Sequence, residues 1–289
     1  GGQGDPQPGP LLRGDRPRDQ TRADRDGLME LPQFLALLGA WADFTEVEII
    51  ALAAVFTRVG AVVALLPGFG EQTLPGRVRL GAALAFTAIV WPVVAPTAET
   101  DFTLGEILLA EAAVGLALGI AIRLMIMVLQ LAGSIAAQAT SVAQIFGAGV
   151  TPDPMPAIGN LLTIAGIALA MSLGLHVKAA TAMVGSYQVA PLGVFPLAGD
   201  AAMWGVARAS AAFALAFSLA APFVVASFAY NLALGAINRA MPQLMVALVF
   251  APAITAGALV LLFLTGPVAL LHWAGELDAV LANPFGMPP

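Results

Sequence analysis

Long apolar runs and short polar or proline-rich interruptions alternate along the chain. Several runs reach the ~20 residues that an α-helix needs to cross the hydrocarbon core of a bilayer. None shows the strict alternation over about 10 residues that is typical of a transmembrane β-strand. The pattern therefore predicts an all-α, polytopic integral membrane protein with about six long apolar helical segments, followed by a short tail at 273–289. The predicted spans cover residues 47–66, 78–94, 103–138, 157–187, 204–230 and 244–264.

The composition agrees with this class and excludes several kinds of site. Of the 289 residues, 59% are hydrophobic and 10% are charged, whereas a soluble domain carries about 25% charged residues. The chain has no cysteine, which excludes disulfides, thiolate catalysis and Cys-ligated metals. His176 and His272 lie far apart without carboxylates at ligand spacing, and no Gly-rich loop follows a strand. We therefore expect no metal, no cofactor, no nucleic-acid partner and no enzymatic activity.

Residues 1–30 differ in composition from the rest of the chain. They are rich in Gly, Pro, Asp and Arg, a composition that cannot bury a core and predicts disorder. They lack the apolar region of a secretory signal peptide, and Met29 could be the true start. We therefore expect a disordered extension at 1–30 and a helical membrane domain at 31–289.

Charged residues inside the predicted spans need partners, because ionisable groups at membrane depth are costly. Arg58 lies in the middle of the first span. Glu111 and Arg123 are 12 positions apart, or about 18 Å along a straight helix, so they cannot pair with each other. Each is expected to find a partner elsewhere. A proton relay through Glu106, Glu111 and His176 is an alternative, although structural contacts between helices are favoured.

Three further stretches carry signals for helix packing or for turns. Gly115 and Gly119 form a GxxxG pair, which allows close approach of two helices. The Gly- and Pro-broken stretch 139–156 predicts either an ordinary loop or a re-entrant segment, which is tolerated only where it lines a cavity or packs in protein. The stretch Asn231–Gln243, NLALGAINRAMPQ, predicts a polar turn between two spans. Its alternatives are a buried polar knot and a contact to a partner subunit.

Five stretches, in order along about residues 31–280, together resemble the FliR family of flagellar biosynthetic proteins. The first is Arg58 followed by PGFGEQTLPGRVR, and the second is EAAVGLALG at 111–119. The third is LAGSIAAQ with its Gly-broken loop, and the fourth is HVKAATAMVGSYQVAPLG. NLALGAINRAMPQ is the fifth and the most specific. The chain departs from the family at Ser134, at Met245 and in the composition of the loop after Gln138.

The resemblance implies a core subunit of the flagellar type III protein export gate, through which unfolded flagellar subunits cross the bacterial inner membrane. It implies paired helical hairpins within an assembly of FliP-like and FliQ-like subunits, a FlhB-like export protein as a further partner, and exported flagellar proteins in transit. The pore or plug loop would include Gly133, Gln138, Phe146, Gly147, Gly149 and Asp153, although a plain surface turn is the alternative. Structural and subunit contacts would involve Arg58, Pro75, Arg77, Arg79, Glu111, Asn238, Arg239, Pro242 and Gln243.

Three other functions stay open at this point. The equivalent subunit of a virulence type III secretion system would have a very similar sequence. A proton-coupled small-molecule transporter could use Glu111 and His176, and it predicts inverted repeats. A membrane assembly scaffold would have partners without secretion.

Overall fold

The computed structural model describes residues 1–2, 46–70, 74–94, 103–140, 157–240 and 246–287. The chain divides into two units, residues 1–46 and 47–289. Nearly all of the first unit lies outside the described residues, and with it the predicted disorder of residues 1–30. The fold below is that of the second unit, with Glu46 added as the first residue of its first helix.

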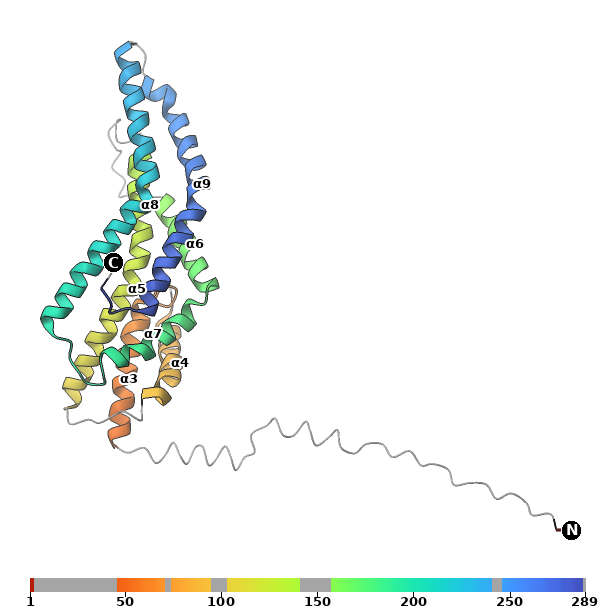
Figure 1. Ribbon diagram of the computed structural model, residues 1–289, viewed down its shortest axis with the longest axis vertical. Coiled ribbons are helices and arrows are strands. Elements are labelled where there is room, and N and C mark those ends of the chain that lie inside the picture. Colours follow the sequence, from red (N-terminus) through yellow and green to blue (C-terminus); the bar gives the residue numbers. More distant parts are fainter. Residues whose placement is uncertain (3–45, 71–73, 95–102, 141–156, 241–245, 288–289) are drawn as a thin grey trace. The chain divides into compact units, whose positions relative to one another are not determined.

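Every regular element among the described residues is an α-helix (Figure 1). Five helices are long and apolar enough to cross a membrane, or six if a bent pair counts as one span. This confirms the predicted all-α, polytopic fold. The helices are α3 (Glu46–Leu65), α4 (Gly76–Val94), α5 (Leu104–Thr140), α6 (Ala157–Ser172), α7 (Leu175–Val189), α8 (Ala198–Ala240) and α9 (Val246–Ala282).

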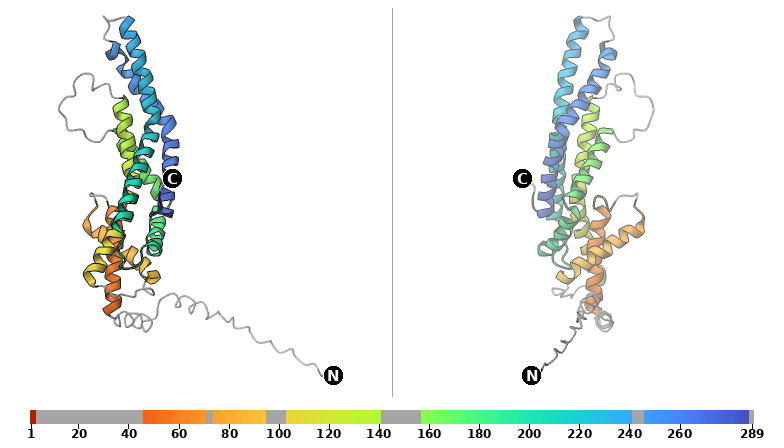
Figure 2. Two further views of the ribbon diagram at one scale, coloured as in Figure 1. Left: turned by 60° about the vertical axis from the view of Figure 1, so that its left-hand side comes forward. Right: turned by 90° about the vertical axis from the view of Figure 1, so that its right-hand side faces the viewer.

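Three helices are much longer than one perpendicular membrane span. The helices α5 and α9 have 37 residues each and α8 has 43, so they extend over roughly 56 and 65 Å at about 1.5 Å per residue. A hydrocarbon core is about 30 Å thick, and such helices must tilt, bend or project beyond it. The helix α8 packs along both α5 and α9 (Figures 1 and 2).

The structure corrects three of the predicted boundaries. The span expected at 157–187 is broken into α6 and α7, which bend by 73°, at Gly174 with a left-handed φ of 80°. The last span does not end at 264, because α9 continues to Ala282 and includes Trp273, which was expected in the tail. Residues 231–240 continue α8 rather than forming a turn.

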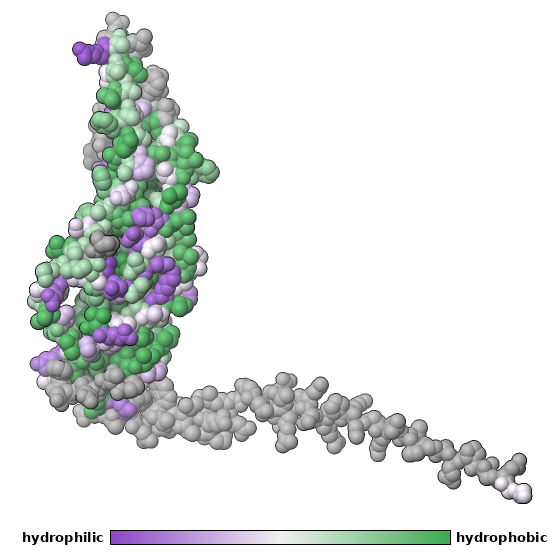
Figure 3. Space-filling model, viewed as in Figure 1, coloured by the Kyte–Doolittle hydropathy of each residue, from purple (hydrophilic) through white to green (hydrophobic). Residues whose placement is uncertain are grey.

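The helix α5 forms the centre of the core, with Ile107, Leu118 and Ile126 almost wholly buried. Trp273 of α9 reaches it from outside, and its indole nitrogen donates to the Met125 carbonyl at 2.7 Å. By contrast, apolar side chains cover much of the visible surface (Figure 3). An outward-facing apolar surface of this kind is what a lipid or protein environment in the membrane requires.

Candidate functional site

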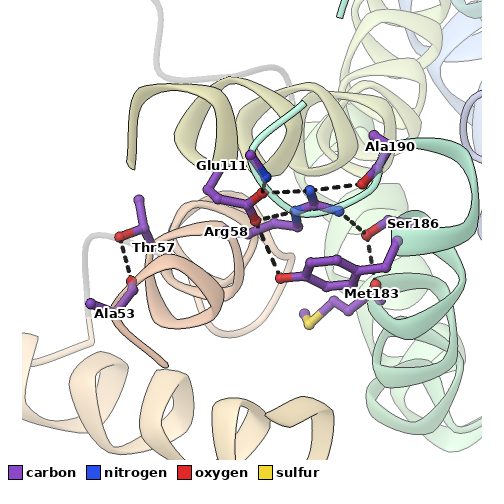
Figure 4. Close-up of polar contacts among 9 residues, drawn as sticks. Ala53, Thr57, Arg58, Glu111, Met183, Ser186 and Ala190 are labelled. Carbon is purple, nitrogen blue, oxygen red and sulfur yellow. Dashed lines mark hydrogen bonds and ion pairs between the residues drawn. The ribbon is translucent and has the colours of Figure 1, made fainter. Parts of the chain in front are cut away.

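An ion pair between Arg58 of α3 and Glu111 of α5 lies at the centre of a buried polar cluster. The guanidinium binds the carboxylate through two parallel contacts, Nε to Oε2 at 2.7 Å and Nη2 to Oε1 at 2.8 Å. Both side chains are fully buried. Figure 4 shows the two groups pointing toward each other from neighbouring helices. A planar guanidinium matches a carboxylate in this two-point geometry, which makes the contact strong and directional.

Residues of α7 and of the connection after it complete the cluster. Arg58 Nη1 donates to Ser186 Oγ at 3.1 Å, and Nη2 donates to the Ala190 carbonyl at 2.9 Å. The guanidinium carbon lies 3.7 Å from the centre of the Tyr187 ring, within the range of a cation–π contact. Glu111 accepts a further bond from the Gly193 amide at 2.9 Å and one from the Tyr187 hydroxyl at 3.3 Å. The cluster therefore joins α3, α5, α7 and the segment that leads into α8.

Glycines of α5 allow α3 to approach closely enough for this pairing. Positions four apart lie on one face of a helix, and Glu111, Gly115 and Gly119 share the face that meets α3. A Cβ on Gly115 would strike the Arg58 carbonyl oxygen, and one on Gly119 would lie 2.9 Å from the Leu65 Cβ. The predicted role of the GxxxG pair in close helix approach is confirmed.

The cluster is suited to holding helices together rather than to catalysis. Glu111 accepts four hydrogen bonds, two of them from Arg58, so its buried charge is compensated. The Ser186 hydroxyl donates to the Met183 carbonyl at 2.6 Å and has no general base beside it among the described residues. A buried pair of this kind gives little net stability, but removing one partner is strongly destabilising.

The proposed proton relay is not supported by the positions of its members. Glu111 belongs to the cluster, whereas His176 lies on the exposed surface of α7. Glu106 bonds to the Thr103 amide at 3.1 Å and to its hydroxyl at 2.8 Å, as an acid does at the start of a helix. Within the described ranges no group of three or more His, Asp or Glu side chains could hold a metal ion.

The sequence-predicted residues at the start of α4 lie at one helix end. Pro75 directly precedes α4, and Arg77 and Arg79 lie in its first turn. Arg77 is exposed. Arg79 Nη2 donates to the Leu74 carbonyl at 3.1 Å. Pro75, Arg77 and Arg79 therefore lie at the start of α4 and outside the Arg58–Glu111 cluster. Their predicted contacts with other subunits stay a prediction.

The structure places two of the predicted loop residues in a helix. Gly133 and Gln138 belong to α5, because the helix continues to Thr140. Gly133 is buried against Gly159 of α6, and a Cβ on Gly133 would strike the Gly159 backbone. Gly133 is therefore a contact between two helices, and Gln138 is exposed near the end of α5. The remaining loop residues, Phe146, Gly147, Gly149 and Asp153, lie outside the described residues.

Of the predicted contact residues near position 240, two lie in a described helix and two lie outside the described residues. Asn238 and Arg239 are in the last turn of α8, and the Arg239 side chain is exposed. Within this single chain Arg239 therefore forms no buried polar knot. It lies on the same part of the α8 surface as Asn231 and Gly235, which are also exposed. Pro242 and Gln243 lie outside the described residues.

Several contacts were not predicted from the sequence. Lys178 of α7 pairs with Asp278 of α9 at 2.6 Å, at a half-exposed position. Arg208 Nη2 of α8 donates to the carbonyls of Asn283 at 2.9 Å and Gly286 at 2.7 Å, beyond the end of α9. The only signal for either contact was a basic residue within an apolar run, which indicates that a partner exists but not which residue it is.

Comparison with known proteins places this architecture in a family. Residues 49–280 match the family described as bacterial export proteins, family 1. A flagellar biosynthetic protein FliR from Caulobacter vibrioides is 34% identical over 222 residues, which cover 74% of this chain and 87% of the relative. The FliR of Bacillus subtilis is 30% identical over 68% of this chain and 79% of its own length. The FliR of Escherichia coli is 27% identical over 65% of this chain and 73% of its own length.

The family match includes all seven described helices in whole or in part, from α3, which carries Arg58, to α9, which carries Trp273 and Asp278. The similarity therefore extends over the helical body as a unit rather than over one motif. On this evidence the chain belongs to the bacterial export proteins, family 1, and within that family to the FliR flagellar biosynthetic proteins.

Proposed function

We propose that this chain is a core subunit of the flagellar protein export gate in the bacterial inner membrane. Its family membership makes it a non-enzymatic, multi-pass membrane component of flagellar export. The finer role is that it helps form the channel through which unfolded flagellar subunits cross the membrane. The observation that carries this proposal is the match to the export family over residues 49–280, together with the flagellar relative from Caulobacter vibrioides that covers 74% of the chain.

The exposed surface supports a role within a larger assembly. Phe228 of α8 and Phe263 of α9 are 71% and 80% exposed, on helices that are longer than a membrane span. Apolar side chains on such helices must meet either lipid or the apolar surfaces of other proteins. We propose FliP-like and FliQ-like subunits and a FlhB-like export protein as these neighbours, with exported flagellar proteins as transient ones.

The transporter hypothesis has less support from the geometry. It requires Glu111 to exchange protons with His176, yet the Glu111 carboxylate is fully buried and accepts four hydrogen bonds. These bonds come from Arg58, Tyr187 and Gly193, whereas His176 lies on the exposed surface of α7. The equivalent virulence subunit is not favoured by any observation, since the relatives found are named as flagellar proteins.

Secretion of flagellin by a strain that lacks this gene tests the proposed function. We expect secretion to be lost and then restored by the gene expressed from Met29. Point variants at Arg58 and Glu111 should be tested in the same strain, with membrane levels of the chain measured alongside. Normal secretion by the deletion strain would refute the flagellar role.

We also propose that Phe146, Gly147 and Gly149, with Asp153 close by in sequence, form a constriction that closes the channel. The Gly-broken sequence of the segment and its position in a chain of the FliR family support this, although its composition departs from that of the family's loop. Deleting residues 145–149 should increase the resting ion conductance of membranes that contain the assembled gate. Unchanged conductance at a normal level of assembled gate would contradict the constriction.

Arg239 is proposed as a contact to a neighbouring subunit. Its side chain is exposed in the last turn of α8, where a partner can reach it. Arg239→Ala should lower the amount of FliP-like subunit that co-purifies with the chain, and Arg239→Lys should restore part of it. Normal co-purification of the alanine variant would show that Arg239 is not such a contact.

A further inference from the structure

A cavity between the first part of α8 and the last turns of α9 contains two opposite charges that do not pair. It has a volume of about 330 Å³ and is partly open to the surface. Arg208 of α8 and Glu276 of α9 both line it, yet no ion pair joins either of them to any other residue that the structure describes. The cavity therefore offers one positive and one negative group to a ligand.

The Arg208 guanidinium has hydrogen bonds but no counter-charge. Arg208 is 7% exposed and lies within a candidate membrane span, where an unpaired charge is costly. Its Nη2 donates to the carbonyls of Asn283, Pro284 and Gly286 at 2.9, 3.2 and 2.7 Å. Its Nε is buried without an acceptor, and within the described ranges Nη1 has no acceptor either. Carbonyl groups carry only partial charges, so the guanidinium still lacks an anion.

The Glu276 carboxylate lacks a donor in the part of the chain that the structure describes. Asp278, two positions further along α9, pairs with Lys178 of α7, so that cation is already engaged by another acid. Glu276 is half-buried at the wall of the cavity. A carboxylate only accepts hydrogen bonds, so a ligand on this side of the cavity must bring a donor, and an ammonium group supplies both the donor and the opposite charge.

The remaining surface of the cavity is largely apolar, and its surroundings are those of a membrane protein. Met125 of α5, Leu215 of α8 and Val280 of α9 line it. Trp204, one turn before Arg208 on α8, donates to the Pro284 carbonyl at 3.1 Å, and tryptophan is enriched at the level of lipid head groups. Pockets between membrane helices that contain basic residues bind such head groups. A ligand with a charged end and a long apolar part therefore fits better than a free ion.

We propose that this cavity binds the head group of a phospholipid with a primary ammonium, of the phosphatidylethanolamine class. The phosphate binds at Arg208 Nη1 and the ammonium binds at Glu276, while the acyl chains follow the apolar surface of the long helices. The trimethylammonium of phosphatidylcholine has no proton to donate, so Glu276 distinguishes the two lipids. Phosphatidylglycerol has no cation for Glu276. The inference requires only that the chain lies in a membrane and does not depend on the export role.

Lipid binding measured by native mass spectrometry tests the site. The full chain, purified in detergent with any subunits that accompany it, is mixed with each of the three lipids carrying identical acyl chains. We expect phosphatidylethanolamine to bind at least about tenfold more tightly than phosphatidylcholine, the factor given by one hydrogen bond to a charged group. Glu276→Gln should remove this preference. Asp200→Asn, exposed in the first turn of α8 and outside the cavity lining, should keep it.

Arg208→Gln tests the phosphate contact. It should weaken phosphatidylethanolamine and phosphatidylglycerol alike, and the Glu276 variant keeps the test decisive if the Arg208 variant folds poorly. Equal binding of phosphatidylethanolamine and phosphatidylcholine by the wild type, or a preference that survives Glu276→Gln, would overturn the site.

Two further outcomes distinguish the lipid from other occupants. Glycerophosphoethanolamine has the same head group without acyl chains, and binding as tight as that of the lipid would overturn a membrane lipid as the occupant. A preference seen in the chain alone but lost when other subunits are bound would overturn it in favour of an acidic side chain from a partner. Failure of the proposed function would appear separately, as normal flagellin secretion in the deletion strain.

Discussion

Breaking the Arg58–Glu111 pair from one side should be much worse than removing both charges. Arg58→Met leaves a fully buried carboxylate with only the Tyr187 and Gly193 donors, and Glu111→Gln leaves a buried guanidinium without a counter-charge. Loss of one partner of such a pair costs about 3–5 kcal/mol. This corresponds to roughly two to four orders of magnitude in the ratio of folded to unfolded protein.

The double variant separates the charge effect from lost packing. With both changes the Gln oxygen can still accept from Gly193, and Ala190 becomes the main unpaired backbone group, at about 1–3 kcal/mol. We therefore expect a total well below the sum of the two single changes, with a coupling energy of at least about 3 kcal/mol. Arg58→Lys should not substitute for the wild type, because an ammonium cannot form the two-point contact.

Unfolding of the purified chain in mixed micelles with increasing denaturing detergent measures these free energies. The matched control is the Lys178–Asp278 pair, which is 35% and 46% exposed. Its double-variant cycle should give less than about 1 kcal/mol, as exposed pairs do. Effects at Arg58 and Glu111 that add to within about 0.5 kcal/mol would refute the argument that uncompensated charge dominates.

Three smaller predictions concern packing and backbone geometry, each measured by thermal unfolding in detergent. Gly115→Val should prevent α3 from seating on α5 and lower the yield of folded chain, whereas Gly81→Val, whose Cβ meets open space, should be tolerated. Trp273→Ala should destabilise by about 3–5 kcal/mol through the lost packing, and Trp273→Phe by less, although the bond to α5 is lost in both. Gly174→Ala should destabilise by about 1 kcal/mol because its φ is +80°, and Gly185→Ala, in open space within α7, should be neutral or stabilising by a similar amount.

The sequence predicts the helices well because an apolar run of span length has few other structures available to it in a membrane. The first span, expected at 47–66, is observed at Val47–Leu65. The break at Gly174 was missed because apolar residues continue on both sides of it. The extension of α9 past 264 was missed because the charged residues Glu276 and Asp278 were assigned to a tail, whereas the helix continues through them to Ala282.

The sequence predicted that Arg58 and Glu111 need buried partners, but not that they pair with each other. Burial costs required partners for Arg58 and Glu111, and both are fully buried and paired. Their separation by 53 positions gives no local signal that they meet each other. The contacts of Tyr187 and Gly193 could not be predicted either. Tyr187 contributes a ring face and Gly193 a backbone amide, and neither group is marked by a charge in the sequence.

Hydropathy alone could not predict which face of each helix turns toward the inside of the bundle. On α8 the small residues Ala212, Ala216 and Ala220 are buried, while the larger Phe213 and Phe217 are exposed. In an apolar environment burial of hydrophobic surface does not select which face of a helix turns inward, and close packing of small residues does.

Packing of small residues alone leaves several similar registers available to two apolar helices. The directional contacts of this chain remove that freedom at a few points: Arg58 with Glu111 between α3 and α5, Ser227 with Ala139 between α8 and α5, and Trp273 with Met125 between α9 and α5. Each uses α5 as one partner. A register shift of one residue in any of the three would leave a buried donor or charge without its acceptor, at a cost of at least about 1–3 kcal/mol. The polar residues within the apolar runs therefore determine which of many apolar packings this chain adopts.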